Sequence, residues 1–136
     1  GRDMLDLPGA PVATWTAGET ARVGWAIDAN HGGGYAYRLC PADSDLSEAC
    51  FQAGHLDFVG DTQWFVGADG SPVANVTTVR TTNGTTPPGS MWMRNAVPME
   101  NPATAKGYVA VPGHPELWGR GPFPFNMLDD VAVPAE

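Results

Sequence analysis

Residues 21–40 read ARVGWAIDANHGGGYAYRLC, and this stretch sets the expected fold. Apolar residues alternate with small or polar ones up to Ile27, and the alternation resumes from Tyr35 to Leu39. A period of two is typical of β-strands, so we expect two paired strands with His31 in the turn between them. The three glycines after His31 leave room for a metal or ligand to approach closely. The alternative is a glycine-rich hairpin with an exposed histidine.

The rest of the chain predicts further short strands separated by glycine and proline. No segment has sustained helical spacing and prolines interrupt most candidates, so we expect no helix. An Asp-Gly pair predicts a hairpin turn at 68–71. Residues 98–124 are expected to form a long surface loop packed on the sheets, or a partly mobile one. The pattern predicts an all-β, immunoglobulin/fibronectin-III-like β-sandwich with long loops. The expected strands are 20–27, 35–39, 62–66, 73–80 and 131–133.

Composition limits the function classes. The 136 residues are 43% hydrophobic, which suffices for one domain over residues 1–136. The net charge is −8 with only seven Lys and Arg, which disfavours binding to nucleic acid and to anionic membranes. No apolar run approaches the roughly 18 residues that span a bilayer, so we expect no membrane insertion. Neutral substrates or partners fit this chain better.

Two features favour an extracellular protein. Cys40 and Cys50 are separated by a short Pro/Asp/Ser-containing loop, so a local disulfide is geometrically easy and would imply an oxidising compartment. The alternative is a reduced pair. Two glycosylation sequons start at Asn75 and Asn83 in a Thr-rich region. We therefore expect a secreted glycoprotein.

Candidate catalytic chemistry is sparse. The chain has three histidines, His31, His55 and His114, but no zinc-binding Cys/His pattern and no EF-hand loop. His55 and His114 are expected to be exposed loop residues and not ligands. The carboxylates show no recognisable acid/base spacing, and no serine stands in a Gly-x-Ser-x-Gly elbow. We assign no catalytic residue within the chain beyond one metal ligand, His31.

Three segments, in order along the chain, resemble the algal and oomycete proteins of the chitin-binding type-4 class, which are related to the lytic polysaccharide monooxygenases. The first is Asn-His-Gly-Gly-Gly-Tyr at 30–35, followed by Tyr-Arg-Leu-Cys-Pro and Leu-Ser-Glu-Ala-Cys-Phe-Gln. The second is the Pro-Pro-Gly-Ser-Met-Trp segment within 86–98, and the third is 126–134. Together they span most of the chain, and the first match is the most specific.

The resemblance implies a copper site. In these oxidases copper is held by the amino group and imidazole of an N-terminal histidine and by a second imidazole, whose place His31 matches. Here residue 1 is glycine, no histidine precedes His31, and the chain lacks the last family strand with its axial aromatic residue. Either these residues are the middle of a longer domain, or this relative kept the sandwich and lost the copper.

Two functions are therefore expected. In the first, the full-length protein is a copper-dependent oxidase that cleaves a neutral polysaccharide of the chitin or cellulose type. In the second, the chain is a non-catalytic carbohydrate-binding or extracellular structural module with assembly partners. In either case His31 should reach the surface, with Asn30 and Tyr35 nearby, and aromatic side chains would stack on sugar rings. The candidates for stacking are Trp64, Trp92, Tyr108 and Trp118, whereas Trp15 and Trp25 are expected in the core.

Overall fold

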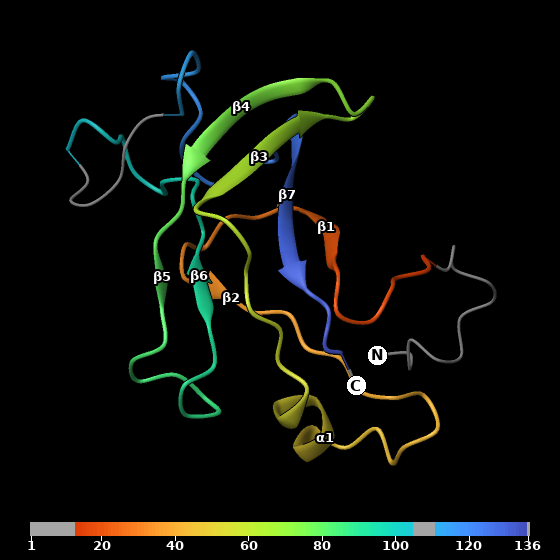
Figure 1. Ribbon diagram of the computed structural model, residues 1–136. Helices are drawn as coiled ribbons and strands as arrows, with labels where there is room; N and C mark the ends of the chain where they lie inside the picture. The colour runs from red at the N-terminus through yellow and green to blue at the C-terminus, as the bar shows by residue number, and fades with distance from the viewer. Residues whose placement is uncertain (1–12, 105–110, 136) are drawn as a thin grey trace.

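The structure is a computed structural model that describes residues 13–104 and 111–135 (Figure 1). Its strands form two antiparallel sheets, one of four strands in the order β1-β7-β3-β4 and one of three in the order β2-β6-β5. The predicted fold class, an all-β sandwich with long loops, is confirmed. The elements are β1 (Thr20–Ala26), β2 (Gly34–Tyr35), α1 (Glu48–Ala53), β3 (Thr62–Gly67), β4 (Pro72–Thr77), β5 (Arg80–Thr81), β6 (Trp92–Arg94) and β7 (Phe125–Ala132).

Strand β7 organises the larger sheet because it pairs with β1 on one side and with β3 on the other. Alternate residues of β7, from Phe125 to Val131, are buried. The residues between them face outward, and one of these, Asp130, pairs with Arg22 of β1 at 2.8 Å. This period of two places one face of the sheet against the core and leaves the other to solvent.

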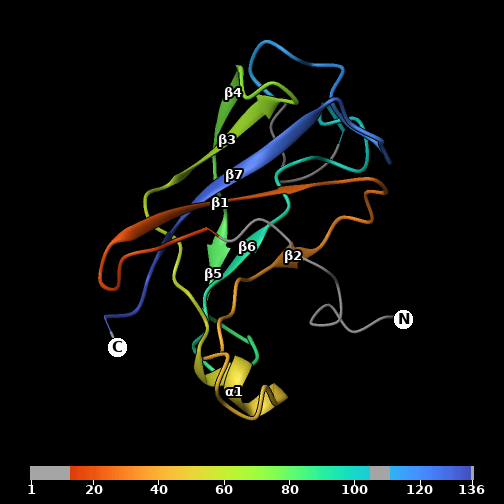
Figure 2. The ribbon, with the colours of Figure 1, turned by 90° about the vertical axis from the view of Figure 1, so that its right-hand side faces the viewer.

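The core has two clusters that lie side by side under the larger sheet. One joins the two sheets through Met93 of β6 and Val131 of β7. The other is covered by loop residues such as Val97 and Val111 and not by the smaller sheet. Figure 2 shows the two sheets stacked in this way, with α1 at the far end from the β3–β4 hairpin. Residues 98–104 and 111–124 contain no strand or helix, and Val111 packs them on the core, as a surface loop would.

Several strand boundaries differ from the sequence prediction. Strand β1 and the hairpin turn after Gly67 are as expected. The predicted strand 35–39 stops at Tyr35, because Leu39 donates its backbone N–H to Gly54 and not to the sheet. The predicted strand 73–80 divides into β4 and β5. Strand β7 begins six residues before the predicted Val131, and β6 was not predicted.

The prediction that the chain has no helix was also wrong, because residues Glu48–Ala53 form the helix α1. It has six residues, too few to show helical periodicity, and Ser47 caps its N-terminus by accepting the backbone N–H of Cys50 at 3.2 Å. The predicted Cys40–Cys50 disulfide is present, with Cα atoms 5.6 Å apart. The disulfide ties α1 to the segment after Tyr37. Cys50 therefore belongs to a helix, whereas the sequence predicted a loop there. Within the described ranges no helix has the length and apolar content to span a membrane.

Candidate functional site

The loop that carries His31 is fixed by the buried side chain of Asn30. Only 1% of Asn30 is exposed. Its amide Nδ2 donates to the carbonyl oxygens of Val97 at 3.2 Å and Gly119 at 2.8 Å. Its Oδ1 accepts the backbone N–H of Gly32 at 2.9 Å and Nδ2 of Asn95 at 2.7 Å. One side chain therefore joins three loops that are far apart in sequence.

Asn95 extends this connection. Its Oδ1 accepts the backbone N–H of Val97, and its own backbone N–H donates to the carbonyl of Gly33. Gly33 has a φ of 79°, a conformation that favours glycine. At Gly34 a Cβ would come within 2.8 Å of the carbonyl oxygen of Met93, so strand β6 can approach only a glycine there. These contacts hold the glycine loop in one backbone conformation.

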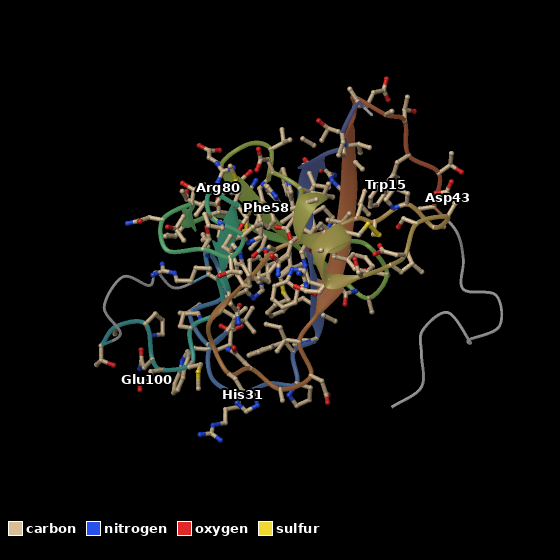
Figure 3. The ribbon with its side chains drawn as sticks, turned by 90° about the horizontal axis from the view of Figure 1, so that it is seen from below. Trp15, His31, Asp43, Phe58, Arg80 and Glu100 are labelled. Atoms are coloured by element: carbon tan, nitrogen blue, oxygen red, sulfur yellow. A yellow bond between two sulfur atoms is a disulfide. The ribbon has the colours of Figure 1, made fainter. Side chains whose placement is uncertain are left out.

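His31 itself is exposed, as predicted, and Figure 3 shows it at the periphery while Phe58 lies in the interior. It borders a hollow of about 250 Å³ that Asn30 and Tyr35 also line. The predicted neighbours, Asn30 and Tyr35, are thus present. The side chain of Asn30, however, is buried and hydrogen-bonds to backbone groups of the surrounding loops. The remaining lining residues are Trp25, Ala26, Ile27, Asp28, Ala29, Gly32, Gly34 and Asn95.

A complete metal site is not formed by the part of the chain that the structure describes, because it contains no group of three or more His, Cys, Asp or Glu that could hold a metal ion. His55 is half-buried, and its backbone forms an isolated antiparallel β-bridge with Arg38. His114, also half-buried, places Nδ1 3.2 Å from Glu116. These two histidines are less exposed than predicted. The described residues do not by themselves fit a copper ion, which would need further nitrogen ligands beside His31.

The four aromatic residues predicted to bind sugar do not form one surface. Trp64 lies on the outer face of the larger sheet, whereas Trp92 lies on the outer face of the smaller sheet, on the opposite side of the sandwich. Trp118 is 42% exposed and precedes Gly119, which is bonded to Asn30, so it lies on the loop beside that of His31. Tyr108 lies outside the described residues.

The two tryptophans expected in the core differ from each other. Trp25 is half-buried and packs on Tyr35, with ring centroids 4.5 Å apart. Trp15 is 37% exposed, so its prediction as a core residue was wrong. It precedes β1, and the alternation that buries every second residue of the strand does not extend to it.

A groove of about 710 Å³ runs over the outer face of the smaller sheet. Trp92 and Val79 are among its apolar lining residues, and threonines are among its polar ones. Gly33 and Gly34 line one part of it, so the groove reaches the glycine loop that carries His31. Sequence reasoning found Trp92 but missed the threonines, although their density at 81–86 was a visible signal. The other lining residues are Arg80, Thr81, Asn83, Gly84, Thr85, Thr86, Met93 and Arg94.

A second polar cluster lies in the core around Asp129, which is 1% exposed. Its carboxylate accepts the hydroxyls of Tyr35 at 3.0 Å and Tyr37 at 2.9 Å and the amide of Gln63 at 2.8 Å. Gln63 also donates to the Tyr35 hydroxyl. Burial, with the neighbouring carboxylate, raises the pKa of both tyrosines well above the ordinary value. Both hydroxyls therefore stay protonated as donors, and the cluster links β2, β3 and β7.

The comparisons with known proteins do not assign a family or a function to this chain. No family model matches the chain, and no solved structure matches it. The resemblance to the chitin-binding type-4 class stays a prediction that rests on the three sequence segments.

Proposed function

We propose that this chain binds a neutral polysaccharide, of the chitin or cellulose type, in the groove lined by Trp92. The observation that carries the proposal is the chemistry of that groove. An indole beside polar residues such as threonine and asparagine offers an apolar face for the C–H groups of a sugar ring and hydrogen-bonding partners for its hydroxyls. A mostly apolar groove with a few polar groups is the usual form of a small-molecule site.

Charge favours a neutral ligand. The chain carries a net charge of −8, which opposes the approach of polyanions. Of the two arginines that line the groove, Arg80 donates Nη1 to the carbonyl of Phe58 at 2.9 Å, which draws its guanidinium towards the interior. The disulfide and the two sequons support a secreted protein, where such polysaccharides are met.

Calorimetric titration with soluble chitin and cellulose oligosaccharides tests the proposal. Trp92→Ala should weaken binding by about two- to tenfold, the loss expected when a stacking aromatic is removed. Trp64→Ala is the matched control, because it removes the same side chain from the outer face of the larger sheet, away from the groove. Val79→Glu guards against misfolding of the first variant, since Val79 is 50% exposed and a charge there would obstruct the groove. Equal affinities for all variants would reject the groove as the binding site.

A second candidate is copper-dependent oxidative cleavage of the same polysaccharide by the full-length protein. The observation that favours it is the exposed His31 on a loop fixed by Asn30 and Asn95. Nitrogen-ligated copper would supply redox chemistry at a glycosidic carbon. His31 would contribute one imidazole, and the other ligands would come from residues outside this chain, in which no histidine precedes His31. Calorimetric titration with Cu(II) of the full-length protein and its His31→Ala variant tests this, and equal affinities would exclude His31 as a ligand.

A further inference from the structure

Asn75, the first sequon residue, stands directly opposite Trp64 in the larger sheet. The register of β3 and β4 pairs Trp64 with Asn75. Directly opposite residues of an antiparallel pair point to the same face, with Cβ atoms about 4.5–5.5 Å apart. Gln63 and Phe65, the neighbours of Trp64, are buried, so this shared face is the outer one. The sequon asparagine and an exposed indole therefore lie side by side on the surface.

The row continues across the sheet as an apolar strip. Trp64 pairs on its other side with Leu128 of β7, and Leu128 pairs with Gly24 of β1. A Cβ on Gly24 would lie 2.8 Å from Cδ2 of Leu128, so the leucine lies over the glycine. Gly24 and Leu128 also line a hollow of about 510 Å³. The surface beside Asn75 is thus a shallow apolar face with an indole at its near end.

We propose that Asn75 carries an N-linked glycan whose first sugar stacks on the indole of Trp64. In the transfer, Nδ2 of Asn75 forms a bond to C1 of the first N-acetylglucosamine. The bond from C1 to the phosphate oxygen of a polyprenyl-diphosphate-linked oligosaccharide breaks, Nδ2 loses one proton, and the lipid diphosphate leaves. The modification is added before folding, so the half-buried position of Asn75 in β4 does not prevent it.

This occupant explains two features of the face. Trp64 is 37% exposed, and a stacked sugar would cover it. Strand β4 is an edge of the larger sheet, as Figure 1 also shows, and a glycan on it would hinder pairing with another chain. Trp64 would then be a support for the protein's own glycan, whereas the proposed polysaccharide groove lies on the other sheet.

The test begins with secretion of the chain from a eukaryotic host and peptide mass analysis of the two sequons. Thr77→Ala removes the first sequon while keeping Asn75 and Trp64, and Asn83→Gln removes only the second. Hydroxyl-radical footprinting then compares wild type with Thr77→Ala. Oxidation of Trp64 should be at least about twofold lower in the glycosylated protein, because a stacked ring would cover most of the indole surface that is exposed. Trp118, 42% exposed and remote in the chain, is the internal reference.

Stability gives a second readout. Enzymatic removal of the glycan should lower the thermal midpoint by about 3–4 °C, as loss of a single surface contact does in a domain of this size. The shift should vanish in Trp64→Ser and persist in Asn83→Gln. An unmodified Asn75, or a modified Asn75 with unchanged Trp64 oxidation and an unchanged midpoint, would overturn the proposal. Neither result would bear on the Trp92 groove.

Discussion

The buried side chain of Asn30 makes a sharp prediction about the loop that carries His31. Asn30→Asp keeps the shape and the Oδ1 acceptor but replaces the Nδ2 donor with an oxygen. That oxygen would face the carbonyls of Val97 and Gly119, which lie 3.2 and 2.8 Å from Nδ2 in the native protein. Two hydrogen bonds are lost and a charge is buried at a position that is 1% exposed.

The expected cost follows from these contacts. Each of the two lost bonds leaves a carbonyl without its donor, at about 1–3 kcal/mol, so the free energy of unfolding should fall by about 2–6 kcal/mol near pH 7. Burial and the two facing oxygens favour the neutral carboxyl, which regains one donor, so the loss should shrink as the pH falls towards about 4. The protonated carboxyl of the introduced aspartate is favoured in the folded state, so its contribution to stability is present at low pH and is lost as the pH rises and the carboxyl ionises.

Urea denaturation followed by tryptophan fluorescence measures the effect at both pH values. Asn101→Asp is the matched control, because Asn101 is exposed and uses its Oδ1 to accept the backbone N–H of Ala103, which an aspartate retains. Its change should stay within about 0.5 kcal/mol. A loss below about 1 kcal/mol for Asn30→Asp would refute the view that Asn30 fixes the loop.

Two further predictions concern the core and the disulfide. Burial and Asp129 raise the pKa of Tyr35 and Tyr37, so the stability they contribute is present below the ordinary tyrosine pKa and is lost as the pH rises above it. Alkaline absorbance titration should show two of the chain's three tyrosines ionising only when the protein unfolds, and ionisation of all three in the folded protein near pH 10 would contradict the buried cluster. Replacing Cys40 and Cys50 together by serine should lower the free energy of unfolding by about 2–3 kcal/mol in urea denaturation, and no change would show that the closed loop adds nothing.

The sequence predicted the elements that have a strong local pattern. Strand β1 shows regular alternation, and the turn after Gly67 has the Asp-Gly pair that hairpins favour. Strand β6 has three residues, too few for a period to be visible. The start of β7 was missed because Phe125 follows a proline-rich run that resembles a loop. Its pairing with β1 and β3 is long-range and leaves no local signal.

The candidate site was predicted in part for a similar reason. An exposed His31 follows from its glycine-rich turn, which is a local property. The clamp by Asn30 depends on carbonyls from Val97 and Gly119, which only the fold brings to it. The separation of Trp64 and Trp92 onto opposite faces also depends on which sheet each strand joins. Side-chain direction along a strand is readable from sequence, but the partner sheet is not.

The central claim is that a neutral polysaccharide occupies the groove lined by Trp92. The most direct measurement is an NMR titration of the ¹⁵N-labelled chain with soluble chitin and cellulose oligosaccharides. The account predicts that the indole N–H of Trp92 and the backbone amides of 33–34 and 79–86 shift, while the indole N–H of Trp64 does not. Unchanged spectra with both sugars, or shifts confined to the Trp64 face, would contradict it.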